Sequence, residues 1–454
     1  MRRMTTDQLS PESILSNLLE TCSKAGATGA DVSYGRSDGV SVDVREGKLE
    51  GIERSEAQGV SLRCVFGQRQ ASVSGSDVSE AGLTALAERC VAMAKVVPED
   101  PYCGLAPVED LAKDLPDLDV SGDGEIPTDT LEHDAIAAEA AALAVPGVQQ
   151  VSGCGNGWST SERWVATSNG FSSYRLSGST GLGLAAVAEK DGAMERDYES
   201  RSVRRLEDRP SAEEIGRIAG ERTVARLGSR KVKTQTGTVI YDRRVAGSLI
   251  GAYLSAIGGP SVARGVSFLK DSLGKQVFAS GVNLIDDPFR KRGMGSRAHD
   301  GEGRAVSRAK LVENGVLTRW LLNGSSAKQL GVVPNGYASG GFGSTPGVGV
   351  SNAYIEAGTQ TPAEMMQAAG KGLLVTDMFG PSINPNTGDY SVGVAGFWFE
   401  GGEIQYPVSE VTIFKDGHAF VLHSGELALD ENGRAALRGL PDPVLGTFWP
   451  VAAD

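Results

Sequence analysis

Apolar and polar positions change period several times along this chain. After Ser10 and Pro11, apolar residues recur at helical spacing from Ile14 to Cys22, which predicts an amphipathic helix with a serine cap and a proline in its first turn. Between residues 30 and 74 the period becomes two, and glycines separate the alternating runs. This pattern predicts an antiparallel meander.

A second series of the same kind follows the meander. Asp77 and Glu80 have the spacing of a capping box ahead of an apolar helical stripe, so we expect a helix to begin there. A further helix is expected over residues 128–144, alternating strands over residues 147–187, and one more helix over residues 211–228.

The length of the chain favours two domains. A chain of 454 residues exceeds one ordinary core, so two domains of about 200 residues each are expected. The fold class indicated is α+β. We predict an N-terminal α+β domain over residues 1–229, made of an antiparallel sheet with helices. A β-rich C-terminal domain follows over residues 230–454, with a helix over residues 242–257.

Residues 384–413 form the most informative stretch of the C-terminal domain. A turn-rich start is followed by a mostly apolar run from Ser391 to Phe399, then by Gly401 and Gly402, and then by an alternating run to Val408. Two strands separated by a glycine turn are typical of a β-hairpin.

The residues of this hairpin, TGDYSVGVAGFWFEGGEIQYPV, resemble a segment of the TldD/PmbA family, specifically of its TldE (PmbA) branch. Three more stretches resemble the same family in the same order, and together they span most of the chain. After Val411 the sequence departs from the usual family ending. The three stretches are VREGKLEGIERSEAQGVSLRCVFGQRQASVSGSD, DDPFRKRGMGSRAHDGEG from Asp286, and GVLTRWLLNGSSAKQLG from Gly315.

The resemblance has an implication for metal binding. TldD-type members carry HExxxH on a helix near the start of the second domain, where two histidines bind zinc and the glutamate activates a water molecule. Here the corresponding positions fall near Gly251, Ala252 and Ala256, which offer no ligand atoms, and no cysteine follows Cys154. The resemblance therefore implies a chain without a cofactor of its own, with zinc expected in a TldD-type partner.

The same resemblance implies an activity for the assembly. A TldE-type subunit would pair with the TldD-type subunit in a cytoplasmic metallopeptidase that cleaves unfolded peptides and removes leader peptides from modified peptide precursors. An extended peptide would bind through main-chain hydrogen bonds to exposed strand edges. Residues 391–408 and 293–303 are the candidate surfaces, and the side chains expected to face the peptide or the partner are Arg297, His299, Asp300, Asn323, Asp389 and Tyr390.

Two alternatives remain open at this point. The chain could be a self-associating peptide-binding or scaffold protein without peptidase activity, since related domains often form two-fold dimers. It could also bind a metal itself through His299, which stands beside Asp300 and Glu302.

Composition narrows the function classes further. A formal charge of −13 and a pI near 5.0 argue against a nucleic-acid-binding surface, because neutralising phosphates needs a concentrated basic face. No apolar run approaches the roughly 18 residues of a membrane-spanning helix. Five cysteines without a CxxC pair are typical of reduced thiols in a cytoplasmic protein. Cys22 and Cys90 fall on predicted apolar helix faces.

Overall fold

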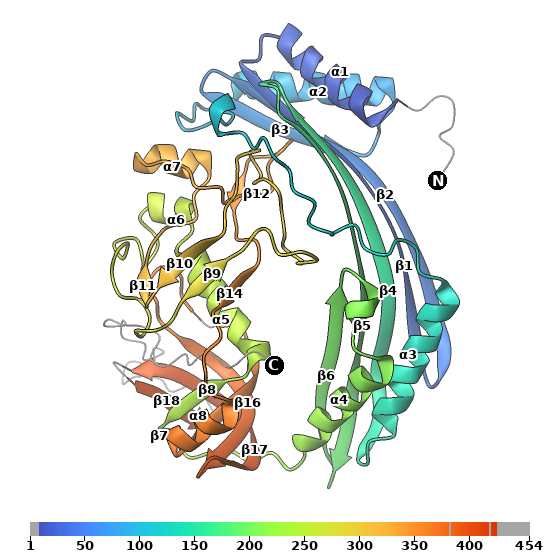
Figure 1. The fold of residues 1–454 in the computed structure, drawn as a ribbon, viewed down its shortest axis with the longest axis vertical. Coiled ribbons are helices and arrows are strands. Elements are labelled where there is room, and N and C mark those ends of the chain that lie inside the picture. The colour runs from blue at the N-terminus through green and yellow to red at the C-terminus, as the bar shows by residue number, and fades with distance from the viewer. Residues whose placement is uncertain (1–8, 381–382, 417–418, 425–454) are drawn as a thin grey trace.

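The N-terminal part of the chain is built on one antiparallel sheet. The structure is a computed structural model that describes residues 9–380, 383–416 and 419–424. Four strands of this sheet contain 17 to 20 residues each and form a long curved wall (Figure 1). In spatial order the strands are β3 (Arg69–Gly75), β2 (Lys48–Phe66), β1 (Gly29–Arg45), β4 (Val148–Thr167), β5 (Ser172–Lys190) and β6 (Ala193–Val203).

Four helices cover one face of this wall. α1 and α2 pack at one end against Val32 and Leu62, and α3 and α4 pack nearer the other end against Val42 and Leu182. Val32 and Val42 lie an even number of residues apart on β1, so both helix pairs cover the same face. The helices are α1 (Pro11–Lys24), α2 (Glu80–Val96), α3 (Thr128–Leu143) and α4 (Ala212–Ala225), and two short 3-10 helices span Val108–Asp110 and Leu206–Asp208.

The helix starts test the capping predictions. Ser10 caps α1 by accepting a hydrogen bond from the amide of Ser13, as predicted. The predicted cap of α2 was wrong, because Ser79 caps this helix and Asp77 instead accepts a hydrogen bond from the amide of Ser79. The aspartate thus fixes the turn before the helix and lies outside the helix itself.

Within its described residues, the C-terminal part contains three further sheets. The largest is mixed, since β8 runs parallel to β15 while the other pairs are antiparallel. Its order is β7 (Gln235–Thr236), β18 (Ala419–Ser424), β17 (Glu403–Asp416), β16 (Ser391–Glu400), β15 (Lys371–Phe379) and β8 (Thr238–Tyr241). A four-stranded sheet has the order β11 (Val316–Leu317), β10 (Ala309–Glu313), β9 (Leu284–Asp286) and β14 (Ala353–Ile355), and β12 (Ala338–Ser339) pairs with β13 (Gly347–Val348).

Four described helices lie between the strands of the C-terminal part. α5 follows β8, and the others are shorter. Their bounds are α5 (Arg243–Ala256), α6 (Gly259–Ala263), α7 (Gly324–Leu330) and α8 (Pro362–Ala369). An antiparallel sheet with helices followed by a β-rich part confirms the predicted α+β class. The boundary at residues 229 and 230 stays a prediction.

The predicted hairpin is β16 and β17, joined through Gly401 and Gly402, which both have positive φ. Its first strand does not offer the exposed edge that we expected for a peptide. β16 pairs with β15 on one side and with β17 on the other, so its main-chain groups are already used. The divergent family ending lies largely in residues 425–454, outside the described residues.

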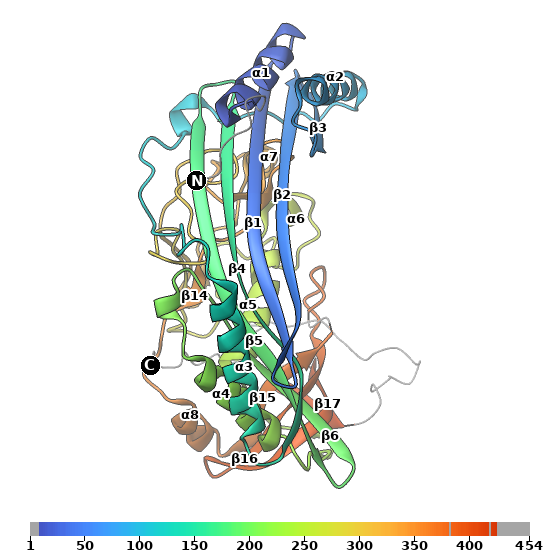
Figure 2. The same cartoon turned by 90° about the vertical axis from the view of Figure 1, so that its right-hand side faces the viewer.

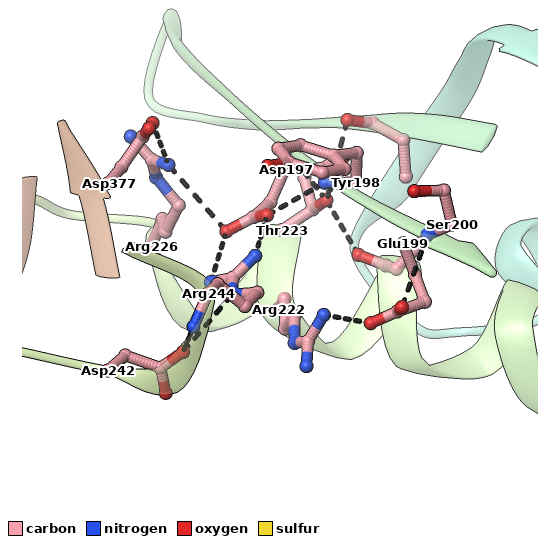
Figure 3. Close-up of polar contacts among 12 residues, drawn as sticks. Asp197, Tyr198, Glu199, Ser200, Arg222, Thr223, Arg226, Asp242, Arg244 and Asp377 are labelled. Carbon is pink, nitrogen blue, oxygen red and sulfur yellow. Dashed lines mark hydrogen bonds and ion pairs between the residues drawn. The ribbon is translucent and has the colours of Figure 1, made fainter. Parts of the chain in front are cut away.

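Polar contacts join the two parts of the chain. Asp197 on β6 accepts a hydrogen bond from Arg244 of α5, and Arg226, just after α4, pairs with both Asp197 and Asp377 of β15 (Figure 3). Figure 2 shows β1, β2, β4 and β5 side by side along the molecule, with α1 and α2 at one end. In the described part of the chain, no helix is both long and apolar enough to cross a membrane.

Candidate functional site

The helix α5 occupies the place where the resemblance locates the zinc motif. Val245, Leu249 and Tyr253 are buried on one face, as predicted. The opposite face carries Gly247 and Gly251, where an added Cβ would meet no atom within 4 Å. The exposed residues of α5 are Arg243, Gly247, Ser248, Gly251 and Ser255. The helix carries no imidazole, thiolate or carboxylate, so its residues do not fit a zinc ion.

The other candidate metal site also does not fit. Both ring nitrogens of His299 are engaged within the chain, and Glu302 binds Arg304 and the amide of Gly324. Asp300 accepts hydrogen bonds from main-chain amides. Among the described residues, no three His, Cys, Asp or Glu side chains gather in a metal-binding group.

His299 instead belongs to a pocket of about 510 Å³ between the N-terminal sheet and the C-terminal loops. This volume falls in the range of about 300 to 1,000 Å³ that is usual for small-ligand sites. Apolar side chains from the connection after α2 form part of its wall, and charged side chains come from β4, β5 and the loop after β9. The lining includes Leu115, Pro116, Leu118, Arg163, Val165, Ser173, Arg175, Arg297, His299, Asp300 and Phe342.

The contacts of His299 fix its tautomer. Its Nδ1 lies 2.7 Å from the carbonyl oxygen of Asp300, and because a carbonyl can only accept, Nδ1 carries the proton. Nε2, 3.1 Å from Oγ of Ser173, then accepts the serine proton. Burial, and then the positive charges of Arg175, Arg163 and Arg297, lower the pKa of His299. The imidazole is therefore held neutral.

Arg163 and Arg175 face each other across the β4–β5 ladder. They are directly opposed in the antiparallel register, which places both side chains on the same face of the sheet. Desolvation, and then the nearby Arg204, Arg163 and Arg297, lower the pKa of Arg175. Arg297 approaches from the C-terminal part and donates hydrogen bonds to the carbonyls of Gly349, Ala338 and Gly336.

Asp300 forms no ion pair with these arginines, although its charge acts on Arg297. Its Oδ1 accepts from the amides of Glu302 and Arg304, and its Oδ2 accepts from the amide of Ala338. Burial, with a smaller contribution from Glu302, raises the pKa of Asp300 to about 6. Asp300 thus orders the loop that carries His299, while its oxygens remain bound to the main chain.

The remaining predicted site residues lie elsewhere. Asn323 is buried and caps α7 by accepting from the amide of Ser326, while its amide group donates to the carbonyl of Pro346. Tyr390 is buried, with its hydroxyl 2.8 Å from that of Tyr241, and Asp389 accepts a hydrogen bond from Thr387 in the turn before β16. The structure thus brings Arg297, His299 and Asp300 together. The expectation that the six residues face a partner or a peptide stays a prediction.

Three residues of the pocket were not predicted from the sequence, namely Ser173, Arg163 and Arg175. Arg163 and Arg175 alternate with apolar residues on predicted strands, so they resemble the solvated face of a sheet. The signal that could have found them is the strand register, which places two arginines opposite each other. That register depends on pairing between strands and is not visible in either strand alone.

Three family models match the chain in succession. They describe the PmbA/TldA metallopeptidase domain 1 over residues 30–94, the central domain over residues 122–227 and the C-terminal domain over residues 234–425. The chain is 34% identical over 403 residues to the metalloprotease PmbA of Escherichia coli O157:H7, a match that covers 88% of this chain and 87% of that protein. It is 33% identical over 397 residues to a metalloprotease PmbA homolog of Haemophilus influenzae, covering 87% and 86%.

Solved structures share the fold. The crystal structure of TldE from Thermococcus kodakarensis superposes with a TM-score of 0.78 at 20% identity, over 88% of this chain and 91% of that chain. A protein of Bacteroides thetaiotaomicron gives a TM-score of 0.82 at 24% identity, over 90% and 91%. At these identities the likeness establishes the architecture alone.

Proposed function

The chain belongs to the PmbA/TldD family, within its PmbA/TldE branch, and from this premise we propose that it is a non-catalytic TldE-type subunit. It pairs with a zinc-bearing TldD-type subunit in a cytoplasmic metallopeptidase. The assembly cleaves unfolded peptides and removes leader peptides from modified peptide precursors. Zinc, held by the partner, supplies the activated water.

The exposed face of α5 is the observation that carries this proposal. Gly247 and Gly251 leave that face flat and open, while the buried face and the ion pair between Arg244 and Asp197 hold the helix in place. A helix face without bulky side chains lets a second backbone approach closely, as small residues do at other helix contacts. We assign this face to contact with the TldD-type subunit.

An edge strand supports the binding of an extended peptide. β6 lies at the end of the N-terminal sheet, and within the described residues only β5 pairs with it. The main chain of Asp197 on this strand already hydrogen-bonds to Thr223 of α4, and elsewhere along its length the strand can offer main-chain donors and acceptors to a peptide of any sequence. This mode of binding favours unfolded chains, because a folded substrate has no free strand to add.

The test measures association and activity together. The chain, a TldD-type subunit of the same organism, and an equimolar mixture are each analysed by size-exclusion chromatography with light scattering. Each sample is also assayed for hydrolysis of fluorescein-labelled casein and for bound zinc. We expect co-elution, casein hydrolysis by the mixture and none by the chain alone.

Two outcomes would contradict the proposal. Hydrolysis by the isolated chain with stoichiometric zinc would make it an autonomous metallopeptidase. A stable homodimer that excludes the TldD-type subunit would favour the self-associating scaffold.

A further inference from the structure

The three arginines of the pocket make no ion pair with an acidic side chain of the described residues, unlike Arg63, Arg209 and Arg304. Arg63 pairs with Asp31, Arg209 pairs with Asp134, and Arg304 pairs with Asp110 and Glu302. Within the described residues, Arg163, Arg175 and Arg297 form no ion pair. Arg175 and Arg297 are partly buried, and a cation withdrawn from water without a paired counter-ion is costly. The charges of Asp286 and Asp300 act on Arg297, but among the described residues no carboxylate pairs directly with any of the three arginines.

The arrangement also opposes folding. Like charges placed directly across a ladder destabilise a sheet, and Arg163 and Arg175 are such a pair. The chain as a whole has an excess of acidic residues, with a formal charge of −13, and yet none of the described ones pairs with Arg163 or Arg175. Electrostatic repulsion that a fold retains at one place is typical of a binding site.

The donors of these arginines are only partly used. The guanidinium of Arg175 makes no hydrogen bond to any described residue, and its buried Nε lacks a partner. Arg297 is held by three carbonyls but its Nε is also unpartnered. Arg163 donates to Ser33 and to the carbonyl of Gly341, and it remains exposed to solvent. The guanidinium groups of Arg163 and Arg297 are therefore held in place by the chain, and the site still has N–H groups that can donate hydrogen bonds to a ligand.

We propose that Arg163, Arg175 and Arg297 form a binding site for a carboxylate group of a peptide, with Arg175 as its central donor. A guanidinium presents two parallel N–H groups that match the two oxygens of a carboxylate. The hydroxyl of Ser173 and the neutral ring of His299 complete the polar lining. The inference rests on the proposed function for the identity of the ligand as a peptide.

The pocket wall favours a carboxylate that is attached to an apolar group. Leu115, Pro116 and Leu118 from the connection after α2 line the cavity, and so do Val165 of β4 and Phe342. Apolar walls with a few converging polar groups are the usual composition of a ligand site. The carboxylate can belong to the C-terminus of a peptide or to an acidic side chain, and the experiment distinguishes the two sources.

The test uses the isolated full-length chain and three dipeptide probes in isothermal titration calorimetry at low salt. N-acetyl-Ala-Leu has a free C-terminal carboxylate, its C-terminal amide has none, and N-acetyl-Ala-Asp amide has only a side-chain carboxylate. We expect one or both carboxylate probes to bind and the uncharged amide to bind at least tenfold more weakly. Raising the salt concentration should weaken the binding, because charge attraction is screened.

Substitutions of Arg175 and of a control arginine test whether the probes bind in this pocket. Arg175→Gln should weaken carboxylate binding at least tenfold, Arg175→Lys should weaken it less, and Arg196→Gln should change it less than twofold. Arg196 is the matched control because it is an exposed arginine on the adjacent strand β6. Without ligand, Arg175→Gln should melt at the same temperature as the parent protein or higher, since it removes the repulsion from Arg163.

Several results would overturn the inference. These are equal binding of the leucine carboxylate and its amide, binding of inorganic phosphate without binding of either carboxylate probe, and carboxylate binding that Arg175→Gln leaves unchanged. The measurements need no partner subunit. If the carboxylate probes do not bind but the chain co-elutes with the TldD-type subunit, this inference alone is refuted. If the probes bind but the chain does not co-elute, the subunit assignment alone is refuted.

Discussion

Asp197 on β6 accepts a hydrogen bond from Arg244 of α5, with 2.7 Å between Oδ1 and Nη1. The same carboxylate lies 3.6 Å from Nη1 of Arg226 (Figure 3). Asp197 is only 4% exposed, so water screens these contacts poorly. One buried carboxylate thus serves two arginines, one beside α4 and one at the start of α5, and it couples the N-terminal sheet to the helix assigned to the partner.

Replacement of Asp197 should therefore destabilise the whole fold. Asp197→Asn removes the counter-ion that the two arginines share, but Arg226 keeps Asp377 and Arg244 keeps Asp242. We therefore expect a loss of about 3 kcal/mol, the lower end of the range for breaking a buried pair. Urea unfolding followed by circular dichroism gives the change in the free energy of unfolding. Glu221→Gln is the control, because Glu221 pairs with Arg217 on the exposed face of α4 and should cost less than about 0.5 kcal/mol. Similar losses in both variants would contradict the structural role of Asp197.

A second contact between the two parts depends on a glycine. The amide of Gly343 donates to Asp31 of β1, and Gly343 has a φ of +83°. A Cβ at this position would overlap the carbonyl of Ser61 on β2. We expect Gly343→Ala to lower the free energy of unfolding by about 2 kcal/mol or more, because the left-handed backbone alone costs an L-residue about 1 to 2 kcal/mol.

The matched control for this variant is Gly347→Ala. An added Cβ at Gly347 meets its nearest atom at 3.8 Å, which is ordinary contact, so the change should stay within about 0.5 kcal/mol. Both variants are measured by the same urea titration. If Gly343→Ala costs no more than Gly347→Ala, the loop does not rest on the sheet as described.

The periodic elements of this fold were predictable, and the relations between them were not. Local apolar spacing identified α1 and the hairpin of β16 and β17, because each is specified by neighbouring residues. The loop residues Arg297, His299 and Asp300 were singled out through the family resemblance, and they do share a pocket. Arg163 and Arg175 escaped notice, since their opposition depends on a register between strands.

The prediction of the residue that caps α2 failed because two neighbouring residues could both serve. Asp77 and Ser79 both have side chains that can cap a helix, and sequence spacing does not decide between them. The chain uses both, one for the turn and one for the helix. Likewise, the apolar run of β16 did not reveal that both of its edges are paired, because edge and centre strands can have the same composition.

The assignment of the α5 face predicts an effect on association without an effect on folding. Gly251→Trp places a large side chain at an exposed position where an added Cβ would meet no atom within 4 Å, so the isolated chain should keep its melting temperature to within a few degrees. Co-elution with the TldD-type subunit should be lost or weakened at least tenfold. Ser16→Trp on the exposed side of α1 is the control and should co-elute normally. Normal association of Gly251→Trp would place the partner elsewhere.

The buried carboxyl group of Asp300 predicts a dependence of stability on pH. Burial raises its pKa in the folded protein to about 6, above the value of about 3.9 for an unfolded chain. The folded state therefore holds the proton more tightly, and its contribution to stability is complete below about pH 4 and is lost as the pH rises through 6. The other carboxyl groups titrate in the same range, so the effect must be isolated by comparing two proteins.

Asp300→Asn provides the comparison. Its amide cannot ionise, and it also points a donor at the amide of Ala338 where Oδ2 now accepts, which adds a penalty that does not vary with pH. The difference in unfolding free energy between the parent protein and the variant should therefore shrink by about 1 kcal/mol from pH 5 to pH 7, given about 1.4 kcal/mol per unit of pKa. Urea titrations of both proteins at pH 5, 6 and 7 measure this difference. A difference that stays constant or grows with pH would mean that the carboxyl group is ionised throughout, stabilised by its three amide donors.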